Sequence, residues 1–492
     1  MSRDKQHRIY IIGAGIAGTA IAREIMDKGI FGTVAAFLDD DAAKIGKKIL
    51  GTPVLGPIDD VLPVLGNKQE DEALIAMPGA QRSVLKNIYF SLKSVGFRRI
   101  RILPTVSQIL DGDAHLIQTK EVDPVDILPR EPVTLNLSEA LAYLRGKRVL
   151  ITGAGGSIGS ELARQLLSGG VQRLYLFGHG ENSIYETERE LRLLQKEGVG
   201  EKAAIVPVIG ELQDRDFMRY ILKKLKADVV FHCAAHKHVP LMEENPVEAI
   251  KNNVFGTKNI VDAAHEAGTE RFVLVSTDKA VEPVSVYGCS KRIAEEIVLS
   301  SSGSSCAYMV VRFGNVLGSR GSILPLFKKQ ILTGGPVTIT SKNASRFFMT
   351  IPEAASLILK AGGVTEKGAL FVLEMGEPIR IVDLAEQLIR FYGFVPYEDI
   401  KIEYIGLRPG EKEEEKLIAS NECFESTPYP GILKVARMGS SALDITSLLD
   451  RLYPVCFPVE GKYELFRNRD FLKSVLTEYF EHYRVFSNNF GG

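Results

Sequence analysis

Two side chains near the middle of the 492-residue chain have the types and spacing for redox chemistry on a hydroxyl group. Tyr287 and Lys291 are four residues apart in YGCSK, so a helix would present both on one face. We expect the Lys291 ammonium to favour a phenolate and so to lower the pKa of Tyr287 from its usual value of about 10. A phenolate can accept a hydroxyl proton while hydride leaves the same carbon. A core tyrosine and a solvated lysine would also explain this spacing, so the neighbouring residues must decide.

Three polar residues just before this pair could handle protons. The apolar run RFVLVS reads as a strand, and Thr277, Asp278 and Lys279 follow where it ends. A carboxyl group and an amine side by side can act as an acid and a base, or they can form a plain salt bridge at a strand end. Because they lie next to Tyr287 along the chain, we favour catalysis.

A glycine-rich turn upstream of these residues predicts a dinucleotide site. KRVLITGAGGSIGSELARQLL has the order strand, glycine turn and helix of a nucleotide-binding fold. The helix N-terminus would offer unpaired N–H groups to a pyrophosphate. The next strand, RLYLFG, ends without the carboxylate that selects NAD over NADP, so the choice between them stays open. The residues expected to cradle the pyrophosphate are Gly153, Gly156, Ser157, Ile158 and Gly159.

A second glycine turn lies near the N-terminus. Gly13, Gly15 and Gly18 have the G-x-G-x-x-G spacing, and Asp39 to Asp41 follow at the distance expected for a ribose-binding acid. A structural turn retained in a regulatory or scaffolding domain explains the pattern equally well. The ligand of this segment therefore stays open.

The elements around both turns predict an α/β protein with two Rossmann-like, doubly wound parallel-sheet domains in series. The first domain is expected over residues 1–118 and a polar, proline-bearing linker over 119–146. The catalytic domain is expected over 147–441, with six or seven strands and a smaller mixed substrate lobe after about residue 315. A helical C-terminal appendage is expected over 442–492.

Composition excludes several classes of function. The chain is 45% hydrophobic and 25% charged with a net charge of −1, which gives no general attraction for nucleic acid. The five cysteines are scattered, and His236 and His238 are better explained by polar packing than by metal ligation, so no metal site is expected. No signal peptide or membrane-spanning run is apparent, and a cytoplasmic location is expected.

These motifs resemble those of the extended short-chain dehydrogenase/reductases, and more closely the nucleotide-sugar 4,6-dehydratases of capsule, O-antigen and flagellin-glycan biosynthesis. The resemblance covers residues 147 to about 416. The first domain, with FLDDD, GTPVLG and IAMPGA, resembles the soluble, CoA-binding-like Rossmann module of the long family members. The motifs that carry the catalytic resemblance are GAGGSIGSEL, AAHKHVPLMEENP, STDKAVEP, YGCSK, VRFGNVLGSRGSILPLF, SRFFMTIPEA and GLRPGEK.

The resemblance implies a reaction with tightly held NAD or NADP on UDP-N-acetylglucosamine or a close UDP-hexose. Family members oxidise carbon 4, eliminate water across carbons 5 and 6, and return the hydride to carbon 6. By this reading Tyr287 takes the proton of the 4-hydroxyl, Lys279 is the base at carbon 5, and Asp278 protonates the departing 6-hydroxyl, while Lys291 supports Tyr287. Thr277 would hold the sugar hydroxyl in register.

The resemblance also implies binding residues and a homo-oligomer. The cofactor would contact Glu211, Leu212, Ala234, Ala235 and Lys237 besides the glycine turn, with Glu211 and Leu212 in GELQD facing the adenine in place of the usual G-D-x-x-D. The UDP-sugar would contact Lys237, Asn315, Ser322, Arg346, Arg408 and Glu411.

The sequence departs from the family at two places that bear on function. Many long members have methionine at the position of Tyr287, so inversion or retention at carbon 5 stays open. Long members also commonly carry N-terminal membrane helices, whereas Met1 here stands just before the first strand. A nucleotide-sugar 4-epimerase is the nearest alternative enzyme, although it needs no acid such as Asp278. A non-catalytic NAD(P) or nucleotide-sugar sensor is the alternative from another class, and Tyr287 argues against it.

Overall fold

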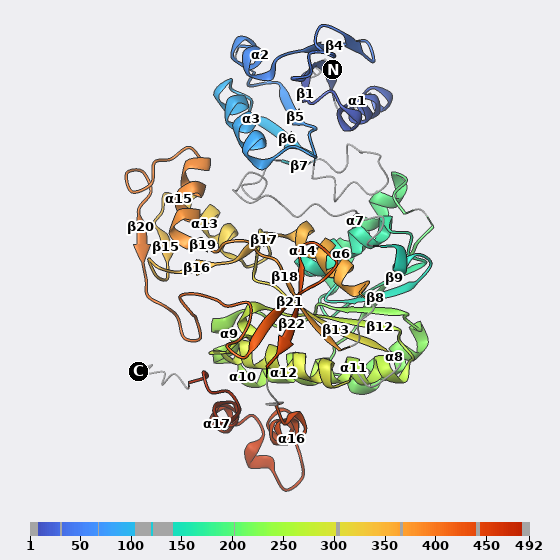
Figure 1. Cartoon of the computed structure of the whole chain (residues 1–492), viewed down its shortest axis with the longest axis vertical. Coiled ribbons are helices and arrows are strands. Elements are labelled where there is room, and N and C mark those ends of the chain that lie inside the picture. Colours follow the sequence, from blue (N-terminus) through green and yellow to red (C-terminus); the bar gives the residue numbers. More distant parts are fainter. Residues whose placement is uncertain are drawn as a thin grey trace, which may run out of the picture. The chain divides into compact units, whose positions relative to one another are not determined.

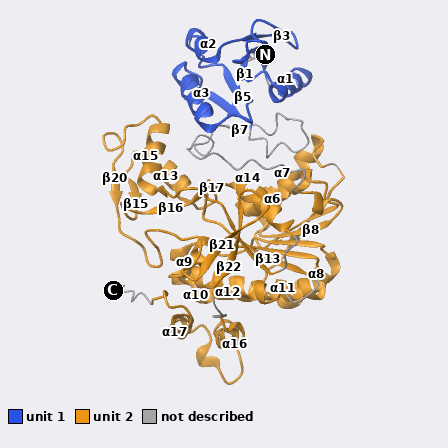
Figure 2. Ribbon diagram, in the orientation of Figure 1, with its two compact units in different colours: residues 1–136 blue, residues 137–492 orange. Residues whose placement is uncertain are grey.

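The computed structural model describes residues 8–29, 32–66, 68–103, 120–121, 141–200, 202–301, 306–364, 368–438 and 443–484. The chain divides into two compact units, residues 1–136 and 137–492 (Figure 2). Most of the linker predicted over 119–146 lies outside the described residues, as does residue 442, where the appendage is predicted to begin.

The first unit is built on a sheet of seven strands in the order β3-β4-β2-β1-β5-β6-β7. The strands from β4 to β6 run parallel, and the short edge strands β3 and β7 are antiparallel. The elements in chain order are β1 (Arg8–Ile12), α1 (Ile16–Lys28), β2 (Thr33–Leu38), β3 (Lys48–Ile49), β4 (Thr52–Leu55), α2 (Ile58–Val64), β5 (Glu72–Ile75), α3 (Arg82–Ser94), β6 (Arg99–Ile102) and β7 (Lys120–Glu121).

Asp39, which follows β2, holds the glycine turn of the first unit in place. The Asp39 carboxylate accepts a hydrogen bond from the backbone N–H of Ala14 at 2.7 Å and forms an ion pair with Lys44 at 3.2 Å. The Asp40 carboxylate accepts from the N–H of Ile58 at 2.7 Å. The first two acids of this run therefore have partners within the unit.

The second unit is built on a sheet of nine strands in the order β10-β9-β8-β11-β12-β13-β18-β22-β21. The first seven strands in this order run parallel, and β22 and β21 add an antiparallel edge. The predicted doubly wound α/β fold is confirmed. The parallel strands are β8 (Arg148–Thr152), β9 (Arg173–Gly178), β10 (Ala204–Ile209), β11 (Val229–His232), β12 (Arg271–Val275), β13 (Ala307–Arg312) and β18 (Ala369–Leu373), and the antiparallel strands are β21 (Glu422–Ser426) and β22 (Ile432–Arg437).

Helices cover both faces of this sheet (Figure 1). The central strands read as continuous apolar runs, as strands covered on both faces do. One face carries α6 (Ser157–Ser168), α7 (Glu181–Lys196) and α14 (Ile351–Gly362). The other carries α8 (Arg215–Leu225), α9 (Val239–Glu244), α10 (Pro246–Ile250), the π-helix η4 (Lys251–Phe255), α11 (Gly256–Glu266) and α12 (Val286–Ser300).

A smaller lobe and a helical pair complete the second unit. The lobe contains β14 (Asn315–Leu317), α13 (Ile323–Leu332), β15 (Val337–Ile339), β16 (Ser345–Arg346), β17 (Phe348–Thr350), β19 (Ile379–Arg380), α15 (Ile381–Phe391) and β20 (Ile402–Tyr404). The final helices, α16 (Ile445–Cys456) and α17 (Arg469–Tyr479), pack against α10 and α12 (Figure 1). Their leucines, Leu448 and Leu472 among them, are buried in the same core as the sheet.

A buried ion network joins α12 to the sheet. The fully buried guanidinium of Arg312 on β13 forms ion pairs with Glu295 of α12 at 2.7 Å and with Glu422 of β21 at 2.6 Å. The Glu295 carboxylate also accepts a hydrogen bond from Ser276 Oγ at 2.6 Å. Helix α12 is therefore fixed against the end of β12.

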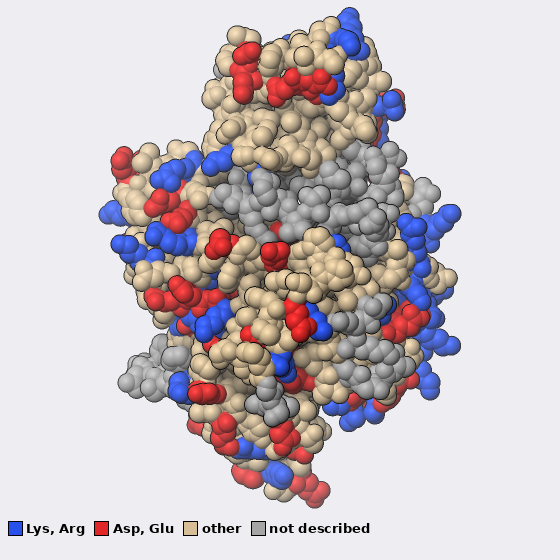
Figure 3. All heavy atoms as spheres, viewed as in Figure 1, with Lys and Arg blue, Asp and Glu red and all other residues tan. Residues whose placement is uncertain are grey.

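The described surface of the second unit carries both signs of charge. Acidic and basic side chains lie near one another over much of the face in Figure 3, in keeping with the small net charge. Among the described residues, every helix is too short or too polar to cross a bilayer.

We predict that Arg312→Met strongly destabilises the second unit. The change leaves Glu295 and Glu422 buried without their shared cation, and breaking such a pair costs about 3 to 5 kcal/mol in the free energy of unfolding. Urea unfolding at pH 7 measures the loss. The control is Arg451→Met, which removes the half-exposed pair with Glu478 and should cost far less, because solvent screens that pair. Equal losses for the two variants would contradict the importance given to the network.

The same comparison should depend on pH. Burial alone would raise the pKa of Glu422, but hydrogen bonds and charge from Arg312 outweigh it and lower this pKa to about 2. A carboxyl group with a lowered pKa stabilises the fold above its unfolded pKa of about 4.3 and loses this contribution as pH falls. The difference between the parent protein and Arg312→Met should therefore shrink between about pH 4.3 and pH 2.

Candidate active site

The glycine turn after β8 forms a cradle that excludes side chains. Gly153 has a φ of +66°, and a Cβ atom there would lie 2.8 Å from the Cα of Ala234. At Gly159 a Cβ would lie 2.2 Å from the carbonyl oxygen of Gly153. Helix α6 begins at Ser157, so Ser157 and Ile158 supply first-turn N–H groups, which have no partner within a helix. The turn and helix N-terminus thus have the shape and polarity that suit a phosphate group.

An arginine from the smaller lobe reaches this cradle. Arg320, in the turn between β14 and α13, donates from its guanidinium to the Gly155 carbonyl at 2.8 Å. Its backbone N–H donates to Ser157 Oγ at 3.0 Å. Sequence reasoning missed Arg320, although it stands within the motif VLGSRGS, because the contact joins residues more than 160 positions apart.

The polar residues after β12 form one hydrogen-bonded group. Thr277 Oγ1 donates to Asp278 Oδ1 at 2.9 Å, and Lys279 Nζ donates to the same oxygen at 3.0 Å. Lys279 Nζ also donates to Asn315 Oδ1 at 3.0 Å, which brings Asn315 into the site. Asp278 is fully buried, and its second oxygen, Oδ2, has no hydrogen-bond partner.

Lys279 carries its proton in this arrangement. Burial alone would lower the pKa of Lys279, but the carboxylates of Asp278 and Glu415 outweigh burial and raise it above its usual value. Glu415 forms an ion pair with Lys279 at 3.5 Å. Glu415 lies three residues after the motif GLRPGEK and is absent from the predicted site.

The prediction that Lys291 lowers the pKa of Tyr287 is wrong for this structure. Both residues lie on α12 and are buried, but Lys291 Nζ donates to the carbonyl of Val275 at 2.8 Å. Burial raises the pKa of Tyr287 to about 12, because it disfavours the phenolate more than the charge of Lys279 and the nearby Thr277 hydroxyl favour it. Burial also lowers the pKa of Lys291 to about 8. Desolvation, which the helical spacing does not reveal, outweighs the neighbouring charges.

A π-helical turn holds the loop after β11. Asn253 lies in η4, where its side chain accepts from the N–H of His236 at 2.8 Å and donates to the His236 carbonyl at 2.9 Å. It also donates to Ser290 Oγ on α12 at 3.0 Å. Asn253 therefore ties the AAHKH loop to the helix that carries Tyr287. Sequence reasoning missed it, although a π-turn is often found at functional sites.

The predicted cofactor-contact residues beyond the glycine turn differ in exposure. The backbone N–H of Ala234 lies 3.3 Å from Thr152 Oγ1, and Ala235 follows it in the same loop. Leu212 is buried beside Gly256, whereas Glu211 is exposed. Of Glu211 and Leu212, only Leu212 is therefore part of the packed core.

The residues predicted to bind UDP are only partly brought together. Burial, followed by the charge of Lys279, lowers the pKa of Lys237, so Lys237 lies close enough to Lys279 to feel its charge. Arg346 is buried, and its guanidinium donates to the carbonyls of Lys412 and Glu413 at 2.7 Å. The more exposed Arg408 pairs instead with Glu411.

Ser322 stands immediately before α13, and its hydroxyl is buried without a hydrogen-bond partner. This predicted residue therefore offers an unused donor and acceptor at the start of a helix of the smaller lobe. Within the described residues, no cluster of three or more His, Cys, Asp or Glu side chains is arranged to hold a metal ion, His236 and His238 included.

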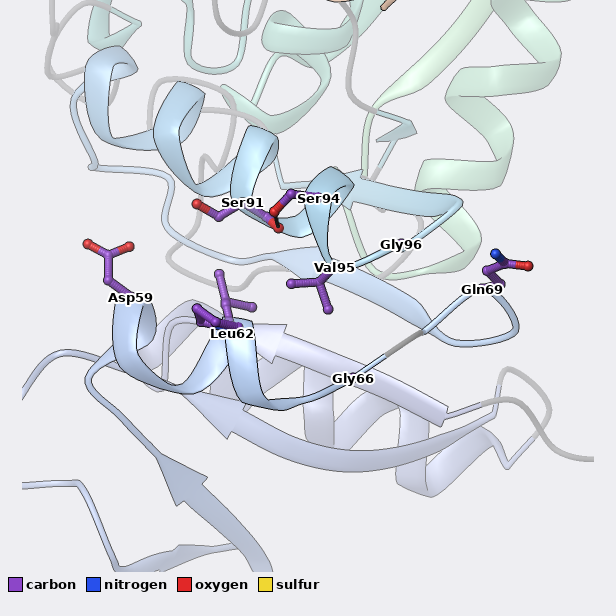
Figure 4. A pocket seen from close by; sticks show the side chains of 9 residues that line it. Asp59, Leu62, Gly66, Gln69, Ser91, Ser94, Val95 and Gly96 are labelled. Atoms are coloured by element: carbon purple, nitrogen blue, oxygen red, sulfur yellow. Dashed lines mark hydrogen bonds between the residues drawn. The ribbon is translucent and has the colours of Figure 1, made fainter.

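A hollow in the first unit lies away from its glycine turn. Asp59 and Leu62 of α2 face Ser91 and Ser94 of α3 across it, as Figure 4 shows. It borders the N-terminal ends of β5 and β6, whereas Gly13 follows the C-terminal end of β1. Ligands of open parallel sheets bind at the C-terminal ends of the strands, so this hollow is not where the turn would hold a nucleotide.

Comparison with known proteins covers most of the second unit. A family model described as "Polysaccharide biosynthesis protein" matches residues 149–437. The probable polysaccharide biosynthesis protein EpsC of Bacillus subtilis is 44% identical over 427 residues, which are 86% of this chain and 70% of EpsC. A UDP-N-acetylglucosamine 4,6-dehydratase (inverting) of Campylobacter jejuni is 32% identical over 282 residues, or 56% of this chain and 79% of that protein. A UDP-glucose 4-epimerase of Rickettsia canadensis is 32% identical over 288 residues, with the same two coverages.

We predict that Gly153→Ala lowers the free energy of unfolding by more than the strain of a positive φ alone explains. Its new methyl group would meet the backbone of Ala234, and such overpacking costs about 1 to 3 kcal/mol. The matched control is Gly170→Ala, because Gly170 also has a positive φ, of +76°, but its new methyl group would meet only Arg145 Cγ at 3.7 Å, an ordinary contact. Urea unfolding measures both variants. Equal destabilisation would mean that the approach of the two loops does not constrain Gly153.

Proposed function

Because the chain belongs to the family of polysaccharide biosynthesis proteins, of the extended short-chain dehydrogenase/reductase type, we propose that it is a UDP-sugar 4,6-dehydratase. The proposed substrate is UDP-N-acetylglucosamine or a close UDP-hexose, and the proposed product is its 4-keto-6-deoxy derivative. The similarity to an inverting dehydratase of Campylobacter jejuni supports this substrate class.

The cradle after β8 supports NAD or NADP as the cofactor. Side chains are excluded at Gly153 and Gly159, and the first turn of α6 supplies N–H groups where a pyrophosphate would lie. Arg320, already at the cradle, adds a cation suited to phosphate. When bound, the nicotinamide would accept hydride from carbon 4 and return it to carbon 6.

One observation carries the choice of a dehydratase. Asp278 and Lys279, an acid and an amine 3.0 Å apart, stand at the end of β12 together with Thr277, whose hydroxyl lies near Tyr287. Oxidation of a hydroxyl needs only a base such as Tyr287. Removal of water from carbons 5 and 6 needs in addition a base for the proton and an acid for the hydroxyl, and this pair supplies both.

The residues of this chain would act in a set order. Tyr287 takes the proton of the 4-hydroxyl, and the ketone formed at carbon 4 makes the proton on carbon 5 acidic. Lys279 removes that proton, and Asp278 gives its own proton to the departing 6-hydroxyl, which leaves as water. Thr277 holds the sugar hydroxyl in place.

The resting protonation states must change before elimination. Lys279 is an ammonium next to the Asp278 carboxylate, whereas the reaction needs a neutral amine and a carboxylic acid. Transfer of one proton across the 3.0 Å contact produces both forms at once. The adjacent placement of the two groups is therefore useful for elimination and not only for a salt bridge.

A 4-epimerase is the competing proposal. An epimerase shares the cofactor cradle and the Tyr287–Lys291 pair, and the similarity to a UDP-glucose 4-epimerase is at the same level of identity. It has no step that needs an acid at the 6-hydroxyl. The fully buried Asp278, with one oxygen left without a partner, favours the dehydratase.

Turnover in deuterated water tests the proposal. The protein is incubated with UDP-N-acetylglucosamine, and the product is followed by NMR. We expect a 4-keto-6-deoxy sugar with deuterium at carbon 5, since the proton that Lys279 removes exchanges with solvent before carbon 5 is reprotonated. The configuration at carbon 5 distinguishes inversion from retention. An unchanged sugar, or a 4-epimer without deuterium at carbon 5, would contradict the proposed function.

A further inference from the structure

Three consecutive glutamates follow the motif GLRPGEK, and only the third is buried. Glu413 is exposed and accepts a hydrogen bond from Ser341 Oγ at 2.6 Å, and Glu414 is also exposed. Only 4% of the Glu415 side chain is exposed. A glutamate run is normally a solvated segment, so the burial of Glu415 needs an explanation.

Glu415 completes a set of three oxygens around Lys279 Nζ. Its Oε1 lies 3.5 Å from Nζ, while Asp278 Oδ1 and Asn315 Oδ1 each lie 3.0 Å away. An ammonium group has three N–H donors, so each of the three segments that meet here provides an acceptor or a counter-charge. Glu415 is the member of this set that comes from the loop before β21.

The loop that carries Glu415 is held by other buried contacts. Arg346 donates to the carbonyls of Lys412 and Glu413 at 2.7 Å. Lys412 Nζ donates to the carbonyl of Val281, also at 2.7 Å. The Glu415 carboxylate therefore lies beside Lys279 on a loop that buried hydrogen bonds hold in place.

The arrangement is unfavourable as a purely structural feature. Two buried carboxylates, of Asp278 and Glu415, share the Lys279 ammonium, and each has one oxygen without a hydrogen-bond partner. Unsatisfied buried polar atoms cost free energy and are rare outside functional sites. Each of the two oxygens is therefore an unused hydrogen-bond acceptor beside Lys279.

We propose that Glu415 is a positioning residue for elimination: its buried carboxylate holds the Lys279 ammonium beside Asp278 and governs how readily Lys279 gives up its proton. The inference rests on the proposed dehydratase function, and it makes Glu415 act through Lys279 and not on the cofactor. The charged or titratable groups near Lys279 are Asp278 of its own turn, Glu415 and Lys412 of the loop, Arg346 of β16, Tyr287 of α12 and Lys237 of the loop after β11.

The variant Glu415→Gln removes the charge and keeps the size of the side chain. Without this carboxylate, protons on the Asp278–Lys279 pair are less stabilised, so the pair loses them at lower pH. Elimination uses the pair while it holds one proton, so the rate of deuterium incorporation at carbon 5 falls at low pH, where the pair takes up a second proton. This acid limb of the pH–rate profile should therefore move to lower pH by about one unit in Glu415→Gln. Glu414→Gln, the matched control one residue away, should keep the limb of the parent protein.

Hydride transfer gives a second readout on the same holoenzyme. Formation of reduced cofactor on addition of UDP-N-acetylglucosamine, followed by its absorbance, should change by no more than about threefold in Glu415→Gln, because Tyr287 and not Lys279 is the base for oxidation. A variant that binds cofactor and reduces it, but incorporates no deuterium at any pH, also supports the inference. If Glu415→Gln does not fold, Glu415→Asp keeps the charge one methylene further back and should move the limb in the same direction.

Two results would overturn the role of Glu415 while the parent enzyme is active. The first is that the acid limb of Glu415→Gln coincides with the acid limbs of the parent protein and of Glu414→Gln. If Glu415→Asp is used instead, the same comparison applies to it. The other is an equal loss of hydride transfer and deuterium incorporation, which indicates general damage to the site. If the parent protein makes no 4-keto product, the proposed dehydratase function is wrong. The role of Glu415 in elimination is then wrong as well.

Discussion

The candidate site depends on the buried ion pair between Arg312 and Glu295. Glu295 lies on α12, which also carries Tyr287, and its carboxylate accepts from Ser276, the residue before Thr277. One carboxylate therefore sets the end of β12 against the helix that carries the tyrosine. Because an unpaired charge in this core costs several kcal/mol, the relative positions of Thr277, Asp278 and Tyr287 belong to the core and not to a mobile loop.

Local patterns were sufficient to predict the parts of the site that lie close together in the sequence. The glycine turn from Gly153 to Gly159 and the polar end of β12 are short motifs with a fixed order of strand, turn and helix. The family resemblance placed Lys279 and Asn315 at different parts of the substrate and predicted no contact between them, whereas the structure brings Lys279 Nζ and Asn315 Oδ1 to 3.0 Å.

Long-range contacts and desolvation could not be predicted from these patterns. Glu415 stands in a run of glutamates that looks solvated, and only tertiary packing distinguishes it from Glu414. Arg320 and Asn253 likewise enter the site only through hydrogen bonds to residues of other elements. The sign of the change in the pKa of Tyr287 was wrong because the i, i+4 spacing reports proximity along a helix and says nothing of burial, which raises that pKa to about 12.

In the proposed reaction one site oxidises carbon 4 and returns the same hydride to carbon 6 after water is lost. A single turnover of UDP-N-acetylglucosamine carrying deuterium at carbon 4, in ordinary water, follows that hydride. We expect a 4-keto product with the deuterium in its carbon-6 methyl group and none lost to solvent. Deuterium retained at carbon 4 of an epimerised sugar would contradict it.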